Sequence, residues 1–449
     1  MGRSRPSLYF LLLLPLFVNL LPFPTSADLN NGTIIALGSA LIASDGTKPW
    51  LSSPSGDFAF GFSQLKGTNQ FLLGIWYANL NDDHPIVWNA NTGSPVPLGS
   101  TLQLSVDGLI LVDPKSNNTL WKIGVGKVKQ GILYDTGKFA ISGSGSAVLW
   151  DTFSHPTNTL LPTQSLEMGT VLISRKENDP MTPGRFYLQM LDSGNLVLST
   201  KSVPTNSDYD AEYYNSQTAA GSGYKLIFSE KGSISVLKRD NTTVLDLYVP
   251  LSSSIVLENY LRLTLNFDGV LGLYRYPKVS TSGNRSWIPL WTQPDNICTK
   301  ITGSKGSGAC GYNNVCSLDT TTNRPSCKCP PGYSLIDPSD QYGNCKPDFV
   351  PTCDGSSSNN SSSYGRLIEV KDTDWPLSDF EQISPSSKED CRNACLEDCF
   401  CSVAIYRSNS CWKKKLPLSN GRIDTSLGAT AFLKVREGSD VPPSSSKHG

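Results

Sequence analysis

The stretch Leu51-Ser-Ser-Pro-Ser-Gly56-Asp-Phe58-Ala-Phe60-Gly-Phe62 joins a tight turn to an alternating apolar strand. Glycine supplies the positive φ that a tight hairpin turn requires. Apolar side chains at every second position then lie on one face of the strand, where they can be buried. The stretch therefore predicts a β-hairpin with one face turned toward a core.

The same pattern recurs within the first 297 residues, which contain no cysteine. Five further copies centre on Gly108, Gly137, Gly194, Gly232 and Gly269. Three of the six glycines precede the Leu149-Trp150 region and three follow it. This grouping predicts an all-β region of two three-sided prisms, over residues 28–150 and 151–290. The alternative is one large sandwich with six unrelated hairpins.

A polar stretch from Asn206 to Asn215 interrupts the second predicted prism. Its composition predicts a long surface loop, which either has no binding role or contacts a ligand.

The cysteines divide the chain into two kinds of material. A long cysteine-free region must fold on an apolar core, whereas the short modules after it bury too little surface and need cross-links. The 12 cysteines form two sets of six: Cys298, Cys310, Cys316, Cys327, Cys329 and Cys345, then Cys353, Cys391, Cys395, Cys399, Cys401 and Cys411. Spacing alone does not choose their pairing. For the second set, a structural zinc site is the competing interpretation, which the even count and an oxidising compartment disfavour.

The start of the chain predicts export. Arg3 and Arg5 precede an apolar run, and small residues follow at Thr25-Ser-Ala27, which is the layout of a cleaved secretory signal over residues 1–27. The alternative is an N-terminal membrane anchor. No later window approaches the apolar length of a spanning helix, and residues 437–449 form a polar tail. We therefore expect a secreted, apoplastic protein, or one on the outer face of the plasma membrane if a longer form exists.

Export agrees with the acceptor triplets for N-glycosylation. They begin at Asn31, Asn117, Asn241, Asn284, Asn359 and Asn360. The net charge is −1, with 17% charged residues. This balance excludes a nucleic-acid groove and a surface for anionic membranes.

Several motifs resemble a known family. Ser53-Pro-Ser-Gly-Asp-Phe-Ala-Phe-Gly-Phe62, Leu73-Gly-Ile-Trp-Tyr77, Ile86-Val-Trp-Asn-Ala-Asn91 and Trp150-Asp-Thr-Phe-Ser-His-Pro-Thr-Asn-Thr-Leu-Leu-Pro162 resemble the bulb-type (G-type) lectin ectodomains of plant S-receptor-like kinases. The resemblance implies tandem β-prism II (bulb-type lectin) domains, an EGF-like module over 291–346 and a PAN-like (apple-like) module over 347–436. In fuller relatives a transmembrane helix and a cytoplasmic Ser/Thr kinase follow.

The resemblance also implies a disulfide pairing. In the EGF-like module it implies Cys298–Cys316, Cys310–Cys327 and Cys329–Cys345. In the PAN-like module it implies Cys391–Cys411 and Cys395–Cys401, which leaves Cys353–Cys399. Calcium binding in EGF-like modules uses an acidic or amide residue before the first cysteine, and Ile297 stands there, so we expect no metal and no cofactor.

Bulb lectins bind mannose with the strand motif Gln-x-Asp-x-Asn-x-Val-x-Tyr, and no intact copy exists here. Around Gly194 only Asn195 and Val197 match, around Gly269 only Asp268 and Tyr274, and around Gly108 only Asp107. Few sugar hydrogen bonds would remain, so we expect the prisms to be a scaffold for another ligand.

Near the second set of cysteines, Ser386-Ser-Lys-Glu389 predicts a capping box that opens a short helix. Cys391, Cys395 and Cys399 would then lie on one face of that helix.

No set of catalytic residues stands out. The histidines His84, His155 and His448 lie in predicted loops or the tail, where they are interpreted as structural. Gly306-Ser-Gly-Ala-Cys-Gly311 matches a dinucleotide-binding pattern, but it lies in a cysteine-rich loop without the required strand and helix. We expect no enzyme in this chain; an exported glycan hydrolase is the remaining enzymatic alternative.

The sequence therefore favours an extracellular recognition module for a glycoconjugate, lipid, peptide or protein. The EGF-like and PAN-like modules would act as a spacer or as a surface for homo- or heterodimers with related receptor ectodomains. The alternatives are a secreted decoy or co-receptor and a truncated fragment of a membrane receptor kinase.

Overall fold

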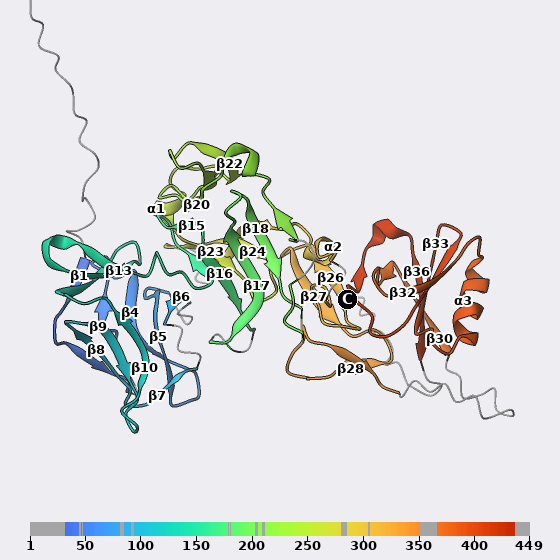
Figure 1. The fold of residues 1–449 in the computed structure, drawn as a ribbon, viewed down its shortest axis with the longest axis horizontal. Coiled ribbons are helices and arrows are strands. Elements are labelled where there is room, and N and C mark those ends of the chain that lie inside the picture. Colours follow the sequence, from blue (N-terminus) through green and yellow to red (C-terminus); the bar gives the residue numbers. More distant parts are fainter. Residues whose placement is uncertain are drawn as a thin grey trace, which may run out of the picture.

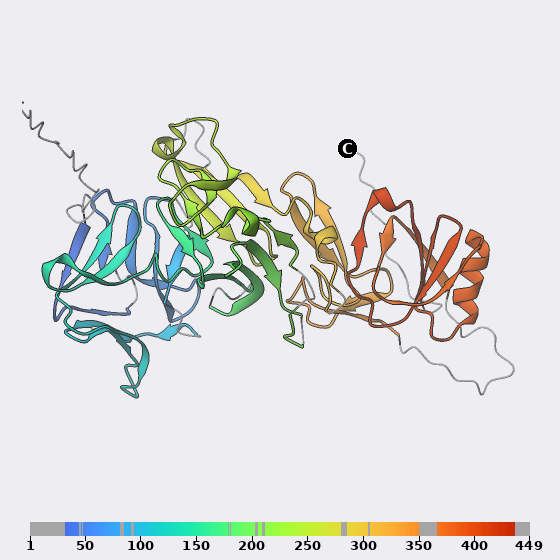
Figure 2. The same cartoon turned by 45° about the horizontal axis from the view of Figure 1, so that its top comes forward.

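Four parts follow one another along a computed structural model of the chain, in sequence order (Figure 1, Figure 2). We call them the first prism, the second prism, the first disulfide module and the second disulfide module. The structure describes residues 32–435 except 45, 47, 81–84, 91–93, 178, 180, 203–204, 209–211, 280–284, 304–305 and 350–365. Outside the described residues lie the expected signal (1–27), the tail (437–449), Asn31, Asn284, Asn359, Asn360, Cys353, His84 and His448.

The first prism consists of three antiparallel sheets, with strand orders β1-β11-β12-β13, β10-β9-β8-β2 and β3-β4-β5-β6, where β7 also pairs with β5. Its core is apolar, with Phe60 and Phe139 stacked at 4.3 Å between ring centroids. The strands are β1 (Gly32–Ala36), β2 (Ala40–Ile42), β3 (Leu51–Ser52), β4 (Phe58–Gln64), β5 (Gln70–Tyr77), β6 (Ile86–Asn89), β7 (Val96–Pro97), β8 (Thr101–Ser105), β9 (Gly108–Val112), β10 (Thr119–Gly124), β11 (Gln130–Tyr134), β12 (Phe139–Ser142) and β13 (Val148–Asp151).

The second prism repeats this plan with the sheets β14-β23-β24-β25, β15-β20-β21-β22 and β16-β17-β18-β19. Leucine side chains from all three sheets meet in one core. The elements are β14 (Thr159–Leu160), β15 (Ser165–Glu167), β16 (Val171–Arg175), β17 (Pro183–Met190), β18 (Leu196–Thr200), β19 (Tyr214–Asn215), β20 (Lys225–Phe228), β21 (Ile234–Leu237), β22 (Thr243–Tyr248), α1 (Ile255–Glu258), β23 (Asn259–Leu265), β24 (Leu271–Pro277) and β25 (Ile288–Gln293).

The six predicted hairpins are confirmed, and with them two successive three-sheet prisms in place of one sandwich. Each predicted glycine has a positive φ and lies in the turn between two paired strands or, for Gly108, at the first residue of the second strand. Strand β13 runs to Asp151 and β25 runs to Gln293, one and three residues past the expected domain ends. Both strands complete a prism sheet, so the boundaries predicted at 150 and 290 fall inside strands.

The segment between the prisms is fixed by tryptophan contacts. Trp88 Nε1 donates a hydrogen bond to the carbonyl of His155 (2.8 Å), and the rings of Trp88 and Trp150 lie 5.9 Å apart. The imidazole of His155 stacks on Trp150 at 5.0 Å. These contacts give His155 a packing role, as predicted for a loop histidine.

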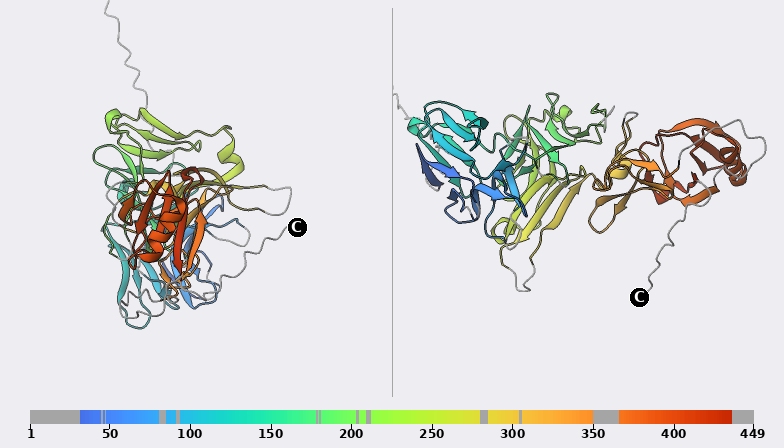
Figure 3. Two further views of the ribbon diagram at one scale, coloured as in Figure 1. Left: turned by 90° about the vertical axis from the view of Figure 1, so that its right-hand side faces the viewer. Right: turned by 90° about the horizontal axis from the view of Figure 1, so that it is seen from below.

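The two disulfide modules share a four-stranded sheet of order β27-β26-β35-β31. Strands β26 and β27 come from the first module, and β31 and β35 from the second. Figure 3 shows both disulfide modules together at one end of the elongated molecule. The first module contains α2 (Ile297–Lys300), β26 (Val315–Asp319), β27 (Arg324–Lys328), β28 (Tyr333–Leu335) and β29 (Cys345–Pro347). The second contains β30 (Arg366–Lys371), β31 (Thr373–Asp374), β32 (Asp379–Ile383), α3 (Lys388–Glu397), β33 (Val403–Arg407), β34 (Ser410–Lys414), β35 (Arg422–Ile423) and β36 (Thr430–Val435).

Five disulfide bonds cross-link these modules. They are Cys298–Cys316, Cys310–Cys327, Cys329–Cys345, Cys391–Cys411 and Cys395–Cys401, the pairs that the family resemblance implies. Cys399 is also disulfide-bonded, and its expected partner Cys353 lies outside the described residues.

The start of helix α3 differs by one residue from the prediction. Its N-cap is Ser387, whose hydroxyl accepts a hydrogen bond from the backbone N–H of Asp390, while the Asp390 carboxylate accepts from the N–H of Ser387. The predicted cap, Ser386, lies one residue too early. The helix ends at Glu397, so Cys399 lies beyond it and only two cysteines, Cys391 and Cys395, share its buried face.

This cap gives a stability prediction with a neighbouring control. Ser387→Ala is expected to lower the free energy of unfolding by about 1 kcal/mol, because the backbone N–H of Asp390 loses its acceptor. Ser386→Ala should change it by less than about 0.5 kcal/mol, since Ser386 is only half-buried and caps no helix N–H. Urea unfolding of both variants tests the assignment, and the reverse order of effects would restore Ser386 as the cap.

Candidate functional site

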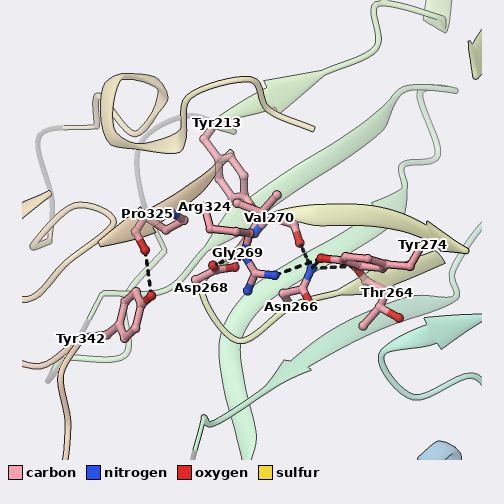
Figure 4. A network of polar contacts seen from close by, with 10 residues as sticks. All are labelled: Tyr213, Thr264, Asn266, Asp268, Gly269, Val270, Tyr274, Arg324, Pro325 and Tyr342. Carbon is pink, nitrogen blue, oxygen red and sulfur yellow. Dashed lines mark hydrogen bonds and ion pairs between the residues drawn. The ribbon is translucent and has the colours of Figure 1, made fainter. Parts of the chain in front are cut away.

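One of the two remnants of the sugar motif that keep two positions lies at the turn between β23 and β24. Side chains of Leu271 and Leu273 belong to the core of the second prism, so Tyr274 lies on the opposite face of β24, the face of the expected sugar motif, and Asp268 lies in the turn before that strand. Figure 4 shows that this face is occupied by other residues of the chain.

Arg324, from strand β27 of the first disulfide module, fills the position between the two remnant residues. Its Nε donates to Asp268 Oδ2 at 2.5 Å, and its Nη1 donates to Tyr274 Oη at 2.9 Å. Asn266 Nδ2 donates to the same Tyr274 oxygen at 2.9 Å. The two residues that were expected as degenerate sugar contacts therefore join the second prism to the module that follows it.

The motif's departures fit this arrangement. Gly272 stands where the motif has valine, and a Cβ at this position would lie 2.6 Å from the ring of Tyr274. Glycine at position 272 therefore leaves the room that the Tyr274 ring needs to extend toward Arg324. Tyr213 directly precedes β19 of the neighbouring sheet, β16-β17-β18-β19. Its Oη donates a hydrogen bond to the carbonyl of Gly269 (2.7 Å), which fixes the turn between β23 and β24.

Burial dominates the electrostatics of the pair. Asp268 is 1% exposed, and loss of water raises the pKa of its carboxyl, while the guanidinium of Arg324 opposes that shift. The carboxylate of Asp268 in turn raises the pKa of Arg324. A buried carboxylate is tolerated here because it is paired and also accepts a hydrogen bond from the N–H of Val270.

The other end of the same sheet face is covered by the first prism. Tyr77 of β5 lies against Tyr260 and Trp287, with ring centroids 5.1 and 5.6 Å away. Its hydroxyl donates to the carbonyl of Leu261 at 2.7 Å. The face is thus closed at one end by the first prism and at the other by Arg324.

The other remnants are incomplete in different ways. Asn195 uses its side-chain oxygen to accept a hydrogen bond from the N–H of Ala219, and Val197 is fully buried. Asp107 is exposed at the turn between β8 and β9. Asn195 and Asp107 therefore each lack a second polar motif residue with which they could bind one sugar. Only Asp268 and Tyr274 form such a pair, and Arg324 already binds both.

Sequence reasoning missed Arg324, because it lies 56 residues from Asp268 in a different module. No local pattern around Arg324 signals this contact. Of the predicted glycosylation positions, Asn117 and Asn241 are described, and both are exposed in hairpin turns.

A pocket of about 490 Å³ lies next to this network, between the second prism and the first disulfide module. Phe267 and Tyr342 form part of its wall, with ring centroids 5.1 Å apart. Polar and charged side chains of both signs complete it. Sequence reasoning did not predict this pocket, since its residues come from segments between positions 175 and 344.

The described residues offer neither a metal centre nor a membrane-spanning helix. Among the described residues, no three His, Cys, Asp or Glu side chains are grouped as metal ligands would be. In the same part of the chain, no helix has the length and apolar character that crossing a membrane requires.

Comparisons place these features among known proteins. The family model for D-mannose binding lectin matches residues 85–182, from β6 of the first prism to just before β17 of the second. The chain is 38% identical to the G-type lectin S-receptor-like serine/threonine-protein kinase LECRK2 of Oryza sativa subsp. indica over 452 residues, 96% of this chain and 54% of that protein. It is 36% identical to RLK1 of Arabidopsis thaliana, described in the same words, over 94% of this chain and 52% of that protein. The chain spans about half the length of these relatives.

Solved structures give weaker matches. The Scilla campanulata agglutinin, a fetuin-binding two-domain lectin, is 19% identical, covers 59% of this chain and 100% of its own, and has a TM-score of 0.22. The mannose-specific agglutinin of snowdrop (Galanthus nivalis) bulbs is 19% identical, covers 28% of this chain and 97% of its own, and has a TM-score of 0.21.

Proposed function

Because this chain belongs to the family of plant G-type lectin S-receptor-like serine/threonine-protein kinases, we propose that it is an extracellular recognition module. It binds an external ligand, with a carbohydrate as the class that the lectin prisms favour, and it does so without catalysis by the described residues. The observation that supports this most directly is the 38% identity to LECRK2 over 96% of this chain. Arg324 already binds Asp268 and Tyr274, the residues left of the mannose motif around Gly269. Binding then uses surfaces of the prisms other than the mannose motif.

The general proposal is tested with two screens on the purified chain. A glycan array and a pull-down against the extracellular proteome are expected to yield at least one saturable ligand. A reduced and alkylated sample is the control, because it keeps the composition but loses the cross-linked modules. Silence in both screens contradicts the proposal.

Monosaccharide binding has its own prediction. Titration with methyl α-D-mannoside is expected to give no saturable binding, since Asp268 and Tyr274 are held by Arg324 and Asp107 stands alone. Calorimetry measures this directly. Saturable binding that Asp107→Ala abolished would instead mean that the remnant around Gly108 still functions.

A further inference from the structure

The pocket beside the Arg324 network has the properties of a small-molecule binding site. Its volume, about 490 Å³, lies in the range of small-molecule sites, which is about 300–1,000 Å³. It is lined by the second prism on one side and by the first disulfide module on the other. The lining residues that matter here are Arg185, Ser202, Phe267, Ser307, Asp340 and Tyr342.

Two of these residues have buried hydroxyls without a hydrogen-bond partner. Ser202 is 2% exposed and Ser307 is 1% exposed, and neither Oγ has a partner. Their backbone carbonyls accept hydrogen bonds from the N–H groups of Asn206 and Asn420. An unpaired buried hydroxyl costs free energy that a ligand oxygen can recover.

Arg185 adds an unpaired donor of the same kind. Its Nη2 donates to the carbonyls of Gly308 (2.8 Å) and Ala309 (2.6 Å), which fixes the guanidinium. Its Nη1 is buried and has no partner. The pocket thus contains three polar groups that have no hydrogen-bond partner: the hydroxyls of Ser202 and Ser307 and the Nη1 of Arg185.

Two aromatic rings of the lining, one from the second prism and one from the first disulfide module, offer an apolar surface. Phe267 and Tyr342 meet edge to face, at an interplanar angle of 83°. Tyr342 is held in place because its hydroxyl donates to the carbonyl of Pro325 at 2.8 Å. Rigid aromatic walls of this kind pack against the C–H face of a sugar ring, while polar groups around them bind its hydroxyls.

The charges of the lining favour a neutral ligand. Three cationic side chains and four carboxylates are interspersed: Arg175, Lys176 and Arg185 with Glu177, Asp179, Asp337 and Asp340. Burial and the nearby carboxylates of Asp268 and Asp340 raise the pKa of Glu177, so a further anion is disfavoured there. A charged ligand of either sign meets like charge, whereas a polyhydroxylated ring both donates and accepts.

We propose that this pocket binds a short neutral oligosaccharide, with Ser202, Ser307 and Arg185 as hydrogen-bonding groups and Phe267 and Tyr342 as the stacking wall. This inference rests on the proposed recognition function and assigns it to a site between modules.

The test uses the full chain and calorimetric titration with cellotriose, mannotriose and xylotriose, with trigalacturonate as the anionic comparison. At least one neutral trisaccharide is expected to bind. Ser202→Ala and Ser307→Ala should each weaken it by about 2- to 12-fold, the worth of one neutral hydrogen bond. Neither should lower the melting temperature, because each removes a hydroxyl that has no partner in the folded chain.

Matched controls exist in the first prism. Ser100 and Ser142 are also buried with unpartnered hydroxyls, but they lie away from the pocket. Ser100→Ala and Ser142→Ala should therefore leave the affinity unchanged.

Three results would overturn the pocket assignment. They are no binding by any neutral trisaccharide, parental affinity in both pocket variants, and tighter binding of trigalacturonate. If a ligand found by the array binds the Ser202→Ala/Ser307→Ala double variant with parental affinity, recognition stands and the pocket assignment fails. If neither the array nor the pull-down yields a ligand, both proposals fail.

Discussion

Replacing Arg324 with alanine is expected to lower the free energy of unfolding by about 3–5 kcal/mol at neutral pH. The guanidinium is 24% exposed, but the Asp268 carboxylate that it neutralises is fully buried. Removal of Arg324 leaves that charge without a counter-ion and takes away one of the two hydrogen bonds that Tyr274 Oη accepts, the other coming from Asn266. Denaturant unfolding, followed by tryptophan fluorescence, measures the loss.

The pH dependence identifies the cause of this loss. The folded-state pKa of Asp268 is already above its ordinary value, and removal of the cation raises it further. A raised carboxyl pKa means that stability is present below the unfolded-state pKa and is lost as the pH rises through the folded-state pKa. The deficit of Arg324→Ala should therefore narrow as the pH falls from about 7 to about 4.

Two variants serve as controls for Arg324→Ala. Asp268→Asn combined with Arg324→Ala should recover much of the loss, because no buried charge remains. Lys388→Ala breaks an ion pair with Glu369 in which both side chains are more than 40% exposed, and it should cost no more than about 1 kcal/mol. Equal effects of Lys388→Ala and Arg324→Ala would mean that burial of Asp268 does not matter.

Local chemistry explains which parts of the fold were predictable. A hairpin requires only a turn glycine and an alternating strand beside it, so Gly56, Gly137 and the other turns could be read from short windows. The paired cysteines followed from the order of a known family. The helix cap was found to within one residue, since Ser386 and Ser387 offer the same hydroxyl and only backbone geometry distinguishes them.

Contacts between distant segments were not predictable. The shared sheet of the two disulfide modules places Cys316 beside Arg422 in a parallel pair, and no periodicity in either segment signals it. The closure of the sugar face likewise depends on which module docks on β23 and β24. The sequence showed that Asp268 and Tyr274 stood in an incomplete motif; it did not show that another side chain of the same chain binds them.

The contacts at the junction of the two prisms were not predictable for the same reason. Tyr77 belongs to a motif that the family resemblance singled out, but its partners come from the other prism. Its ring lies 4.6 Å from Phe58 in its own prism and 5.1 Å from Tyr260 across the junction, measured between centroids. One side chain is therefore part of two packing surfaces.

Tyr77→Ala is expected to lower the free energy of unfolding by about 3–5 kcal/mol and to divide a shared unfolding transition of the prisms into two. The cavity would separate Phe58 from Tyr260, and the carbonyl of Leu261 would lose its donor. Tyr77→Phe keeps the ring and should cost only about 1–3 kcal/mol, with one transition retained, because just the hydroxyl is removed. Scanning calorimetry distinguishes the two variants. A single transition in Tyr77→Ala, at the parental temperature, would show that the prisms are coupled by other contacts.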